Sequence, residues 1–256
     1  MVNLHDYKSN VHSQYGEDGI IKFLLGCITR TGFVIEFGAA DGFFCSNTAA
    51  IWKQGSDALL IESNAELYEK LVAGTVRYPN VTTKCAYVHN IDDFTTRVAD
   101  VCSIDVDGSD YQIARDMQTP HQIVLVEYNP TVPPDVEMIH VEGTMYGSSA
   151  LTITNQMEGK GYTLVACTKT NLIFLYGDHR DRFEHRLDVL FDRSSLNYVV
   201  TSYDGYYDMI GEFGYGFKRP VDLRLHGRDK YVRKTLDTDT EEWVRYISAL
   251  EKGKNV

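Results

Sequence analysis

Residues 33–42 have the sequence FVIEFGAADG, a short apolar run that ends in a turn with two glycines. Such a run predicts a buried strand, and the glycines let the backbone behind it approach a ligand closely. Open α/β sheets bind ligands at the carboxyl ends of their strands. The spacing Glu-x-Gly-x-x-x-Gly departs from the Gly-x-Gly-x-x-Gly of dinucleotide sites, and Glu36 and Asp41 suit a cationic or hydroxyl-rich ligand better than a pyrophosphate. A tight turn with a surface acid would explain the same residues without a ligand.

Similar apolar runs recur along the chain, separated by polar stretches of helical length. The predicted strands are 33–37, 58–61, 81–88, 101–106, 122–128, 162–166 and 171–176, and the predicted helices are 46–54, 64–73, 91–99, 109–118 and 148–160. This alternation is typical of an α/β fold with a mostly parallel sheet and helices on both faces. The turn-forming residues 168–170 predict that the last two strands form a hairpin.

The length of 256 residues favours one domain over two independent folds. Within it we expect a core over 12–176, an N-terminal helical segment over 1–30, and a C-terminal extension over 177–256 that is rich in tyrosine and charge. The stretch 203–217, dense in glycine and tyrosine, predicts irregular structure, and 238–252 predicts a terminal helix. Tyrosines of the extension would serve as a carbohydrate platform or as a homodimer interface.

The charge balance argues against partners that need a basic surface. The chain has 25 Lys+Arg against 36 Asp+Glu, a formal net charge of −11, and no cluster of basic residues. Nucleic acids and anionic membranes are poor partners for such a chain, which favours a small molecule. The five cysteines contain no Cys-x-x-Cys pair, and we find neither a secretory signal nor an apolar run of the roughly 18 residues that span a bilayer. We therefore expect a cytoplasmic location.

Two further strand ends suggest contacts with a nucleoside. Glu62 ends the second predicted strand, where a carboxylate can accept two hydrogen bonds from a ribose diol. A solvated acid at a strand end is the alternative interpretation. The third strand ends in Cys-Ala-Tyr-Val, 85–88, in which Ala86 is small and apolar enough to flank an adenine, although these residues equally suit core packing.

Oxygen-bearing side chains follow the fourth and fifth predicted strands. Asp105 and Asp107 point to the same side of one strand, and Glu127 and Asn129 to the same side of the other. If the strands are neighbours, these groups converge and could hold Mg²⁺, bind substrate hydroxyls or supply a general base. Capping of the following helices by Asp107 and Asp110 is the simpler alternative. His140, in the loop after the fifth strand, is a rival base or a surface residue.

A set of short motifs, in order, resembles one enzyme family. The motifs are SQYGEDG (13–19), EFGAADG (36–42), SNT (46–48), LIE (60–62), SIDVDGSDY (103–111), VEYNP (126–130), YGSS (146–149) and KGYTLV (160–165). Together they resemble an S-adenosylmethionine-dependent methyltransferase of the FkbM-like group, over about residues 12–176. The resemblance implies the class I methyltransferase fold, a Rossmann-like sheet of seven mostly parallel strands with a terminal antiparallel hairpin.

The resemblance also implies roles for individual residues. It places Glu36 and Gly38 against the methionine part of the cofactor, Glu62 against the ribose hydroxyls and Asp105 near the far side of the cofactor. It implies that Gln14, Asp18 and Asn47 help to close the site. With Asp41 and Ala86, these residues form the predicted S-adenosylmethionine site. Members of the group usually methylate hydroxyls of sugars or natural products.

The hypothesis from the sequence is therefore an O-methyltransferase acting on a sugar hydroxyl, in a nucleotide-sugar or glycan precursor of bacterial surface or capsular polysaccharide. Asp107, Glu127 and His140 are the candidate catalytic residues, and Asp107, Glu127 and Asn129 are the candidate ligands of Mg²⁺. A natural product, a phosphoramidate or an amine as acceptor would leave the same motifs. A non-catalytic or NAD-binding α/β protein is the alternative from another class.

Overall fold

The computed structural model describes residues 1–140, 146–196, 198–201, 207–210, 221–224 and 231–234. Contacts along the chain divide it into two compact units, Met1–Arg193 and Ser194–Val256. The first unit contains every residue that the sequence assigns to the candidate site. The predicted division into a core that ends at 176 and an extension from 177 stays a prediction.

Seven strands of the first unit form one sheet in the order β3-β2-β1-β4-β5-β7-β6. The strands are β1 (Phe33–Phe37), β2 (Asp57–Glu62), β3 (Val81–Cys85), β4 (Val101–Ile104), β5 (Ile123–Glu127), β6 (Tyr162–Cys167) and β7 (Asn171–Tyr176). The first five pair in parallel, whereas β7 pairs antiparallel with both β5 and β6. Six strands therefore run one way and β7 runs the other, which confirms the predicted Rossmann-like sheet with a terminal hairpin.

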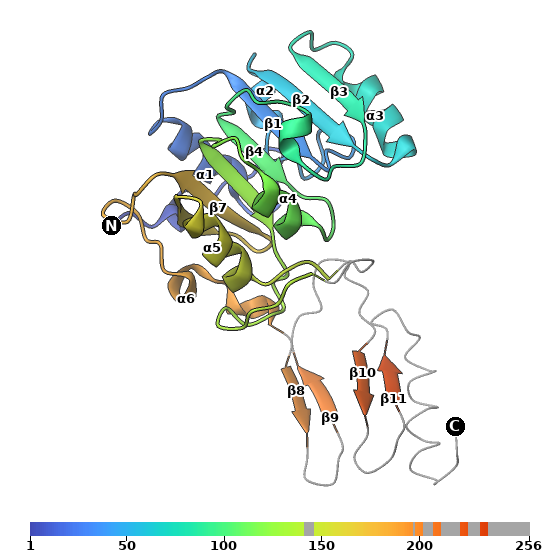
Figure 1. The fold of residues 1–256 in the computed structure, drawn as a ribbon, viewed down its shortest axis with the longest axis vertical. Helices are drawn as coiled ribbons and strands as arrows, with labels where there is room; N and C mark the ends of the chain where they lie inside the picture. The colour runs from blue at the N-terminus through green and yellow to red at the C-terminus, as the bar shows by residue number, and fades with distance from the viewer. Residues whose placement is uncertain (141–145, 197, 202–206, 211–220, 225–230, 235–256) are drawn as a thin grey trace. The chain divides into compact units, whose positions relative to one another are not determined.

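Helices cover both faces of this sheet (Figure 1). They are α1 (Glu17–Leu25), α2 (Ala49–Trp52), α3 (Ala65–Thr75), α4 (Asp110–Asp116), α5 (Ala150–Gly159) and α6 (Leu187–Leu190), with short 3-10 turns at Leu4–Tyr7, Ile91–Asp93 and Arg193–Ser195. Leu24 of α1, Trp52 of α2 and Leu71 of α3 share one hydrophobic cluster with alternate residues of the strands. Helices α4 and α5 contact each other as well as the strands β4, β5, β6 and β7.

All seven predicted strands are present, and β1 has the predicted bounds. Strand β3 ends at Cys85 instead of 88, and β4 ends at Ile104 instead of 106. The predicted helix over 46–54 is confirmed only as the single turn of α2, from Ala49 to Trp52. The prediction of a helix over 91–99 is wrong, because only the 3-10 turn Ile91–Asp93 forms there.

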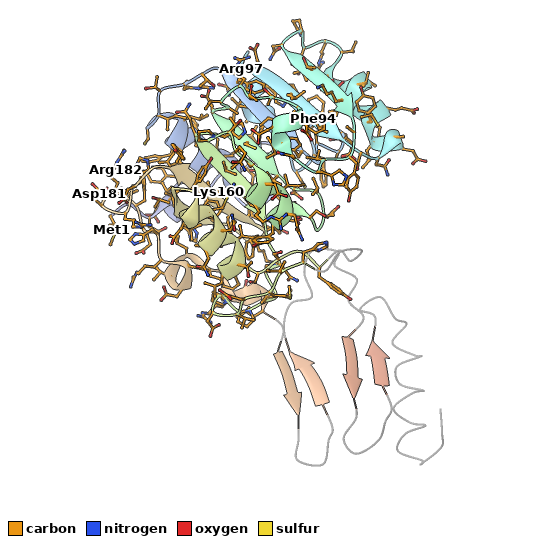
Figure 2. All side chains as sticks on the ribbon, in the orientation of Figure 1. Met1, Phe94, Arg97, Lys160, Asp181 and Arg182 are labelled. Atoms are coloured by element: carbon orange, nitrogen blue, oxygen red, sulfur yellow. The ribbon has the colours of Figure 1, made fainter. Side chains whose placement is uncertain are left out.

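Side-chain contacts explain the missing helix. The carboxylate of Asp92 accepts hydrogen bonds from the backbone N–H groups of Gln118 and Thr119, which ties the turn to the loop after α4. Phe94, which is labelled in Figure 2, packs edge-on against Phe37, with ring centroids 6.0 Å apart. Arg97 lies 4.5 Å from the centroid of the Phe33 ring and donates to Asp57 at 2.7 Å. The side chains of Asp92, Phe94 and Arg97 thus contact different parts of the fold. A helix over 91–99 would instead align side chains of helical spacing along one face.

The second unit contributes two described hairpins. Strand β8 (Tyr198–Thr201) pairs antiparallel with β9 (Tyr207–Ile210), and β10 (Val221–Arg224) pairs antiparallel with β11 (Tyr231–Lys234). The strand β9 corrects the expectation of irregular structure across 203–217, since a regular ladder forms within it. The predicted helix over 238–252 lies outside the described residues.

All five cysteines are free, in line with the absence of a disulfide framework in the sequence. Among the residues that the structure describes, no helix combines the length and the apolar composition needed to cross a bilayer.

Candidate functional site

Acidic side chains gather at the carboxyl edge of the sheet, where β1, β2, β4 and β5 end. Their register explains the gathering, because Glu36 of β1 lies beside Leu60 of β2 and beside Ser103 of β4. Sequence segments that are far apart in the chain therefore place their carboxylates along a single edge, which is where open α/β sheets bind ligands.

Glu36 is buried and accepts three hydrogen bonds from one short segment. Its carboxylate receives Ser46 Oγ at 2.6 Å, the backbone N–H of Asn47 at 2.8 Å and Thr48 Oγ1 at 2.6 Å. Burial raises the pKa of Glu36, and these hydrogen bonds act in the opposite direction. The side chain thus shapes the loop between β1 and α2, and its predicted contact with the methionine part of a cofactor stays a prediction.

Gly38 marks the closest approach of two strand ends. Its φ is +75°, a backbone conformation that favours glycine, and a Cβ atom built there would lie 1.6 Å from the carbonyl oxygen of Asp105. The turn after β1 therefore presses directly against the backbone after β4. Only a residue without a side chain allows this contact, which is a stronger requirement than the sequence pattern alone implied.

Glu62 links the loops that follow β1 and β2. One carboxylate oxygen accepts the backbone N–H of Ala40 at 2.8 Å, and the other accepts the N–H of Asn64 at 2.7 Å. Ala40 has a φ of +47°, so the carboxylate holds a strained part of the turn in place. Each oxygen keeps a second lone pair that can accept a further hydrogen bond, as a ribose diol would require.

The remaining predicted cofactor residues lie in the same loops. Asp41 accepts the backbone N–H groups of Phe43 and Phe44 through one oxygen. The side-chain amide of Asn47 donates to Ser103 Oγ of β4 at 3.0 Å. Ala86 is half-buried and donates its N–H to the carbonyl of Glu62.

Asp18, near the start of α1, organises the segment before this helix. One of its oxygens accepts the consecutive backbone N–H groups of residues 11, 12 and 13, each at 2.7 Å. The other oxygen, Oδ1, is buried without a hydrogen-bond partner within the described part of the chain. Gln14 lies exposed on the segment that Asp18 holds, and His12 of that segment donates from Nδ1 to the carbonyl of Phe43 at 3.2 Å. The segment therefore contacts the loop after β1, close to the predicted cofactor residues.

Asp105, Asp107 and Glu127 come together at the ends of β4 and β5. One carboxylate oxygen from each lies within 4.8 Å of the others. Burial raises the pKa of Asp105 to about 8, and repulsion from Asp110 and Asp107 adds to the rise, while a hydrogen bond with Glu127 opposes it. Burial, followed by the charge of Asp105, raises the pKa of Glu127 well above its usual range. Two hydrogen-bonded acids with raised pKa values are able to hold and release a proton.

Asp107 and Asp110 divide the roles that the sequence left open. Asp110 accepts the backbone N–H groups of Val106 and Gly108 at 2.7 and 2.9 Å, so it holds the loop before α4 and does not cap the helix as the simpler interpretation expected. Asp107 instead extends from a left-handed backbone position, with a φ of +58°. It joins the acidic cluster, which leaves Asp110 as the structural member of the pair.

Asn129 and His140 have other surroundings. The amide oxygen of Asn129 accepts both the N–H and the hydroxyl of Thr131, at 3.0 and 2.6 Å, while its Nδ2 donates to the carbonyl of Tyr146 at 2.6 Å. These hydrogen bonds hold the Asn129 side chain in the loop after β5. The residue that lies in the acidic cluster with Asp107 and Glu127 is Asp105. His140 is buried, and its backbone N–H donates to Ser148 Oγ at 2.8 Å.

Sequence reasoning missed Asn171, the first residue of β7. It is buried and lies directly opposite Glu127 in the antiparallel pair of β5 and β7. The predicted hairpin over 162–176 would have located it only if the register between β7 and β5 had been known.

A separate hollow of about 540 Å³ opens between α4, α5 and the loop after β5. It is lined by Tyr111, Glu137, Ile139, Thr152, Asn155 and Gln156. None of the predicted site residues is among them.

Comparisons with known proteins give likenesses of fold. No family model matches the chain, and no curated protein matches it. Among solved structures, the chain is similar to the CMeT domain of the citrinin polyketide synthase, with 14% identity and a TM-score of 0.44 over 63% of this chain and 51% of that one. It is also similar to a TehB-like SAM-dependent methyltransferase from Corynebacterium glutamicum ATCC 13032 Kitasato, with 11% identity and a TM-score of 0.41 over 63% and 88% of the two chains.

A third likeness is to a SAM-dependent methyltransferase from Aquifex aeolicus, with 11% identity and a TM-score of 0.42 over 62% and 88% of the two chains. The chain thus spans about half the length of the first of these structures and most of the other two. At such identities the likeness concerns the fold, which the strand order establishes by itself. Membership of the FkbM-like group stays a prediction.

Proposed function

We propose that this protein is an S-adenosylmethionine-dependent O-methyltransferase that methylates a hydroxyl of a sugar. The observation that supports it most is the cluster of Asp105, Asp107 and Glu127, whose carboxylate oxygens lie within 4.8 Å of one another at the carboxyl edge beside the glycine turn of β1. A site for hydroxyl methylation needs a cofactor cradle and a proton acceptor side by side. Here both lie on neighbouring strands of one sheet.

The residues at the edge of β1 and β2 fit the cofactor. The turn at Gly38 is free of a side chain, Glu62 retains lone pairs for a diol, and Asp18 Oδ1 is a buried acceptor that lacks a donor among the described residues. An ammonium group and two ribose hydroxyls are the donors that such acceptors require. We therefore assign Asp18, Gly38 and Glu62 to cofactor binding.

The chemistry follows from the acids on β4 and β5. When bound, S-adenosylmethionine supplies an electrophilic methyl group whose carbon–sulfur bond breaks with its electron pair leaving on sulfur, as the acceptor oxygen forms the new carbon–oxygen bond. Glu127, with Asp105, takes the proton that the hydroxyl loses. Desolvation and the neighbouring carboxylates raise the pKa of Glu127, so it accepts the proton at a pH where an exposed acid would be a weak base.

A divalent cation is a second assignment for the same carboxylates. Asp105, Asp107 and Glu127 supply hard oxygen atoms within 4.8 Å of one another, a donor set that fits Mg²⁺. Such an ion would lower the pKa of a hydroxyl bound to it. Asp105 replaces Asn129 in this proposed ligand set, since the amide of Asn129 is bonded to Thr131 and Tyr146.

We propose that the sugar is a nucleotide-sugar or a glycan precursor for surface polysaccharide made in the cytoplasm. This assignment rests on the resemblance to the FkbM-like group, whose members usually methylate hydroxyls of sugars or natural products. The acidic edge supports it, because carboxylates bind hydroxyl-rich ligands well. A natural product with a hydroxyl is the alternative acceptor. The proposal requires no partner other than a small molecule. It also includes a homodimer formed through the tyrosines of the extension. Of these tyrosines, Tyr203, Tyr206 and Tyr215 lie outside the described residues.

The test is an assay of methyl transfer from S-adenosylmethionine to a panel of nucleotide-sugars and methyl glycosides, followed by mass spectrometry. We expect a product heavier by one methyl group, formed by the wild-type chain and lost in the variant Glu127→Gln. Parallel reactions with EDTA and with added Mg²⁺ decide between the base and the metal assignments. Turnover unchanged by EDTA would remove the metal, and transfer by Glu127→Gln at the wild-type rate would contradict the role of the carboxylate.

A further inference from the structure

Asn171 has a buried polar atom that the fold does not use. The residue is only 4% exposed. Its Nδ2 donates to Thr170 Oγ1 at 3.2 Å, whereas its Oδ1 has no hydrogen-bond partner among the described residues. A buried acceptor without a donor is destabilising, so an amide in this position favours a donor that arrives with a ligand.

The register places this amide beside the acidic cluster. Asn171 of β7 is directly opposite Glu127 of β5. The backbone N–H of Tyr128 donates to the carbonyl of Thr170 at 2.9 Å, which identifies the pair of Glu127 and Asn171 as a non-hydrogen-bonded pair of the antiparallel ladder. In such pairs the Cα atoms are about 4.5 Å apart and the side chains lie on the same face, closer than in any other cross-strand pair.

The backbone of Asn171 is held by contacts that do not involve its amide. Its N–H donates to Thr168 Oγ1 at 3.2 Å, and its carbonyl accepts the N–H of Thr168 at 2.8 Å. The hydroxyl of Thr168 in turn donates to Glu17 of α1. A change of the Asn171 side chain therefore leaves the turn between β6 and β7 with its own hydrogen bonds.

The two neighbouring side chains differ in chemistry. Glu127 belongs to the pair that accepts the proton of the reacting hydroxyl. Asn171 offers a neutral acceptor at the spacing of directly opposite side chains in an antiparallel ladder. Oxygen atoms on adjacent carbons of a sugar ring lie about 3 Å apart, within the reach of two acceptors at that spacing. One hydroxyl can thus meet the carboxylate while its neighbour donates to the amide.

We propose that Asn171 is a substrate-binding residue that accepts a hydrogen bond from the hydroxyl adjacent to the one methylated, so that the acceptor substrate is a vicinal diol. The inference rests on the proposed function, since it uses the same edge of the sheet. It narrows the substrate class from any hydroxyl to one with a hydroxyl neighbour. An acceptor that lacks this neighbour leaves Oδ1 of Asn171 buried without a donor.

The experiment compares diols with their deoxy counterparts. Methyl α-D-mannopyranoside, methyl α-D-galactopyranoside and UDP-glucose, each with its monodeoxy analogues, serve as acceptors for the full chain in the presence of S-adenosylmethionine. We expect the wild-type chain to methylate at least one diol and to lose about 10- to 100-fold in kcat/KM on the analogue without the adjacent hydroxyl. Asn171→Leu and Asn171→Ala should lose a similar factor in kcat/KM on the diol. On the deoxy analogue, kcat/KM of both variants should equal that of the wild-type chain.

Two controls separate binding from structure. Thr170→Val removes the partner of Asn171 Nδ2 and leaves Oδ1 untouched, so it should keep the wild-type preference for the diol. Asn171→Leu removes a buried acceptor without a donor while keeping the volume, so the free protein should unfold at the wild-type temperature or above it. A structural asparagine would instead give a lower unfolding temperature in this variant.

The outcomes distinguish this inference from the proposed function. If S-adenosylmethionine fails to bind, both are wrong. If it binds and no acceptor of the panel is methylated, both are wrong as well. If a deoxy analogue is methylated as fast as its diol, or if Asn171→Leu discriminates between diol and deoxy acceptor as the wild-type chain does, the proposed function stands and the vicinal diol is wrong. Loss of the diol preference in Thr170→Val as well would also overturn the role of Oδ1.

Discussion

At the scale of single residues, the site depends on backbone positions that most side chains avoid. Gly38, Ala40 and Asp107 all have a positive φ, and they lie in the loops after β1 and β4. At non-glycine residues such as Ala40 and Asp107, a positive φ costs of order 1–3 kcal/mol and persists where the surrounding contacts over-determine it. Glu62 supplies one such contact through the N–H of Ala40. The strain is thus concentrated where the ligand edge is built.

Gly38→Ala should be strongly destabilising. The new Cβ would meet the carbonyl oxygen of Asp105 at 1.6 Å, so β1 and β4 would have to separate at their carboxyl ends. We expect the unfolding free energy to fall by about 3 kcal/mol or more, together with loss of cofactor binding. Urea unfolding measures the first effect.

Gly32→Ala is the matched control for this change. Gly32 also has a positive φ, of +73°, but a Cβ built there meets nothing within 4 Å. Its cost should be limited to the backbone conformation, about 1 kcal/mol. Equal losses in the two variants would show that the contact between Gly38 and Asp105 is not what the fold depends on.

At the scale of elements, strands were more predictable than helices. The apolar runs of β1, β4 and β5 are buried along most of their length, and burial on both faces is what the runs indicate. The segment 91–99 has helix-compatible residues, but Asp92, Phe94 and Arg97 make contacts with three different parts of the fold. Tertiary contacts of this kind override local propensity and leave no periodic pattern.

The candidate site shows the same division. The convergence of Asp107 and Glu127 was predictable because neighbouring parallel strands end at one edge, although Asp107 lies in the loop beyond the end of β4 at Ile104, where strand alternation no longer applies. The place of Asn129 was not, since its amide turns to Thr131 in a loop without periodicity. Asn171 required the register of an antiparallel pair whose partners are far apart in sequence, which composition and spacing do not contain.

The acidic pair of Asp105 and Glu127 should give activity and stability opposite dependences on pH. The pKa of Asp105 is raised from its usual value to about 8, so the folded protein binds a proton that the unfolded chain has released, and stability falls as pH rises from about 4 to about 8. Asp105→Asn removes this effect. We expect it to raise the unfolding free energy at pH 8 by roughly 1–3 kcal/mol while turnover is lost.

The same raised pKa predicts a pH profile. Since the proton acceptor must be deprotonated and the pKa values of Glu127 and Asp105 are both raised, kcat/KM of the wild-type chain should rise with pH through the neutral range, above the range of an ordinary carboxyl group. Asp93→Asn, at an exposed acid, is the control that should leave both stability and profile unchanged. A profile that falls between pH 6 and 8, or an Asp105→Asn variant that unfolds more easily than the wild-type chain, would contradict the account of the pair.

At the scale of the whole molecule, one buried histidine sets a limit on acid stability. His121, just before β5, is fully buried, and its Nδ1 accepts the backbone N–H of Ala99 at 3.0 Å. Burial lowers its pKa to about 4, against a small opposing effect of Asp92. In the folded protein the ring is therefore neutral, and protonation would remove the acceptor for Ala99.

This histidine predicts a loss of stability in mild acid. Because the folded-state pKa lies below the unfolded value of about 6.5, the unfolded chain takes up a proton first, and stability falls as pH drops from about 6.5 towards about 4, by up to about 3 kcal/mol. His121→Asn keeps an acceptor for the N–H of Ala99 but cannot titrate. Its urea midpoint should vary less between pH 7 and pH 5 than that of the wild-type chain. Equal dependence in the two proteins would assign the acid sensitivity to other groups.

The central claim concerns the cofactor, and isothermal titration of S-adenosylmethionine and S-adenosylhomocysteine into the full chain tests it most directly. We predict micromolar binding of both, weakened at least about tenfold in Glu62→Gln, since the glutamine amide loses one of the two acceptors that hold Ala40 and Asn64. Glu69→Gln, at an exposed acid on α3, should bind as the wild-type chain does. Absence of binding by the folded wild-type chain, or equal binding by Glu62→Gln, would contradict the assignment of this edge to the cofactor.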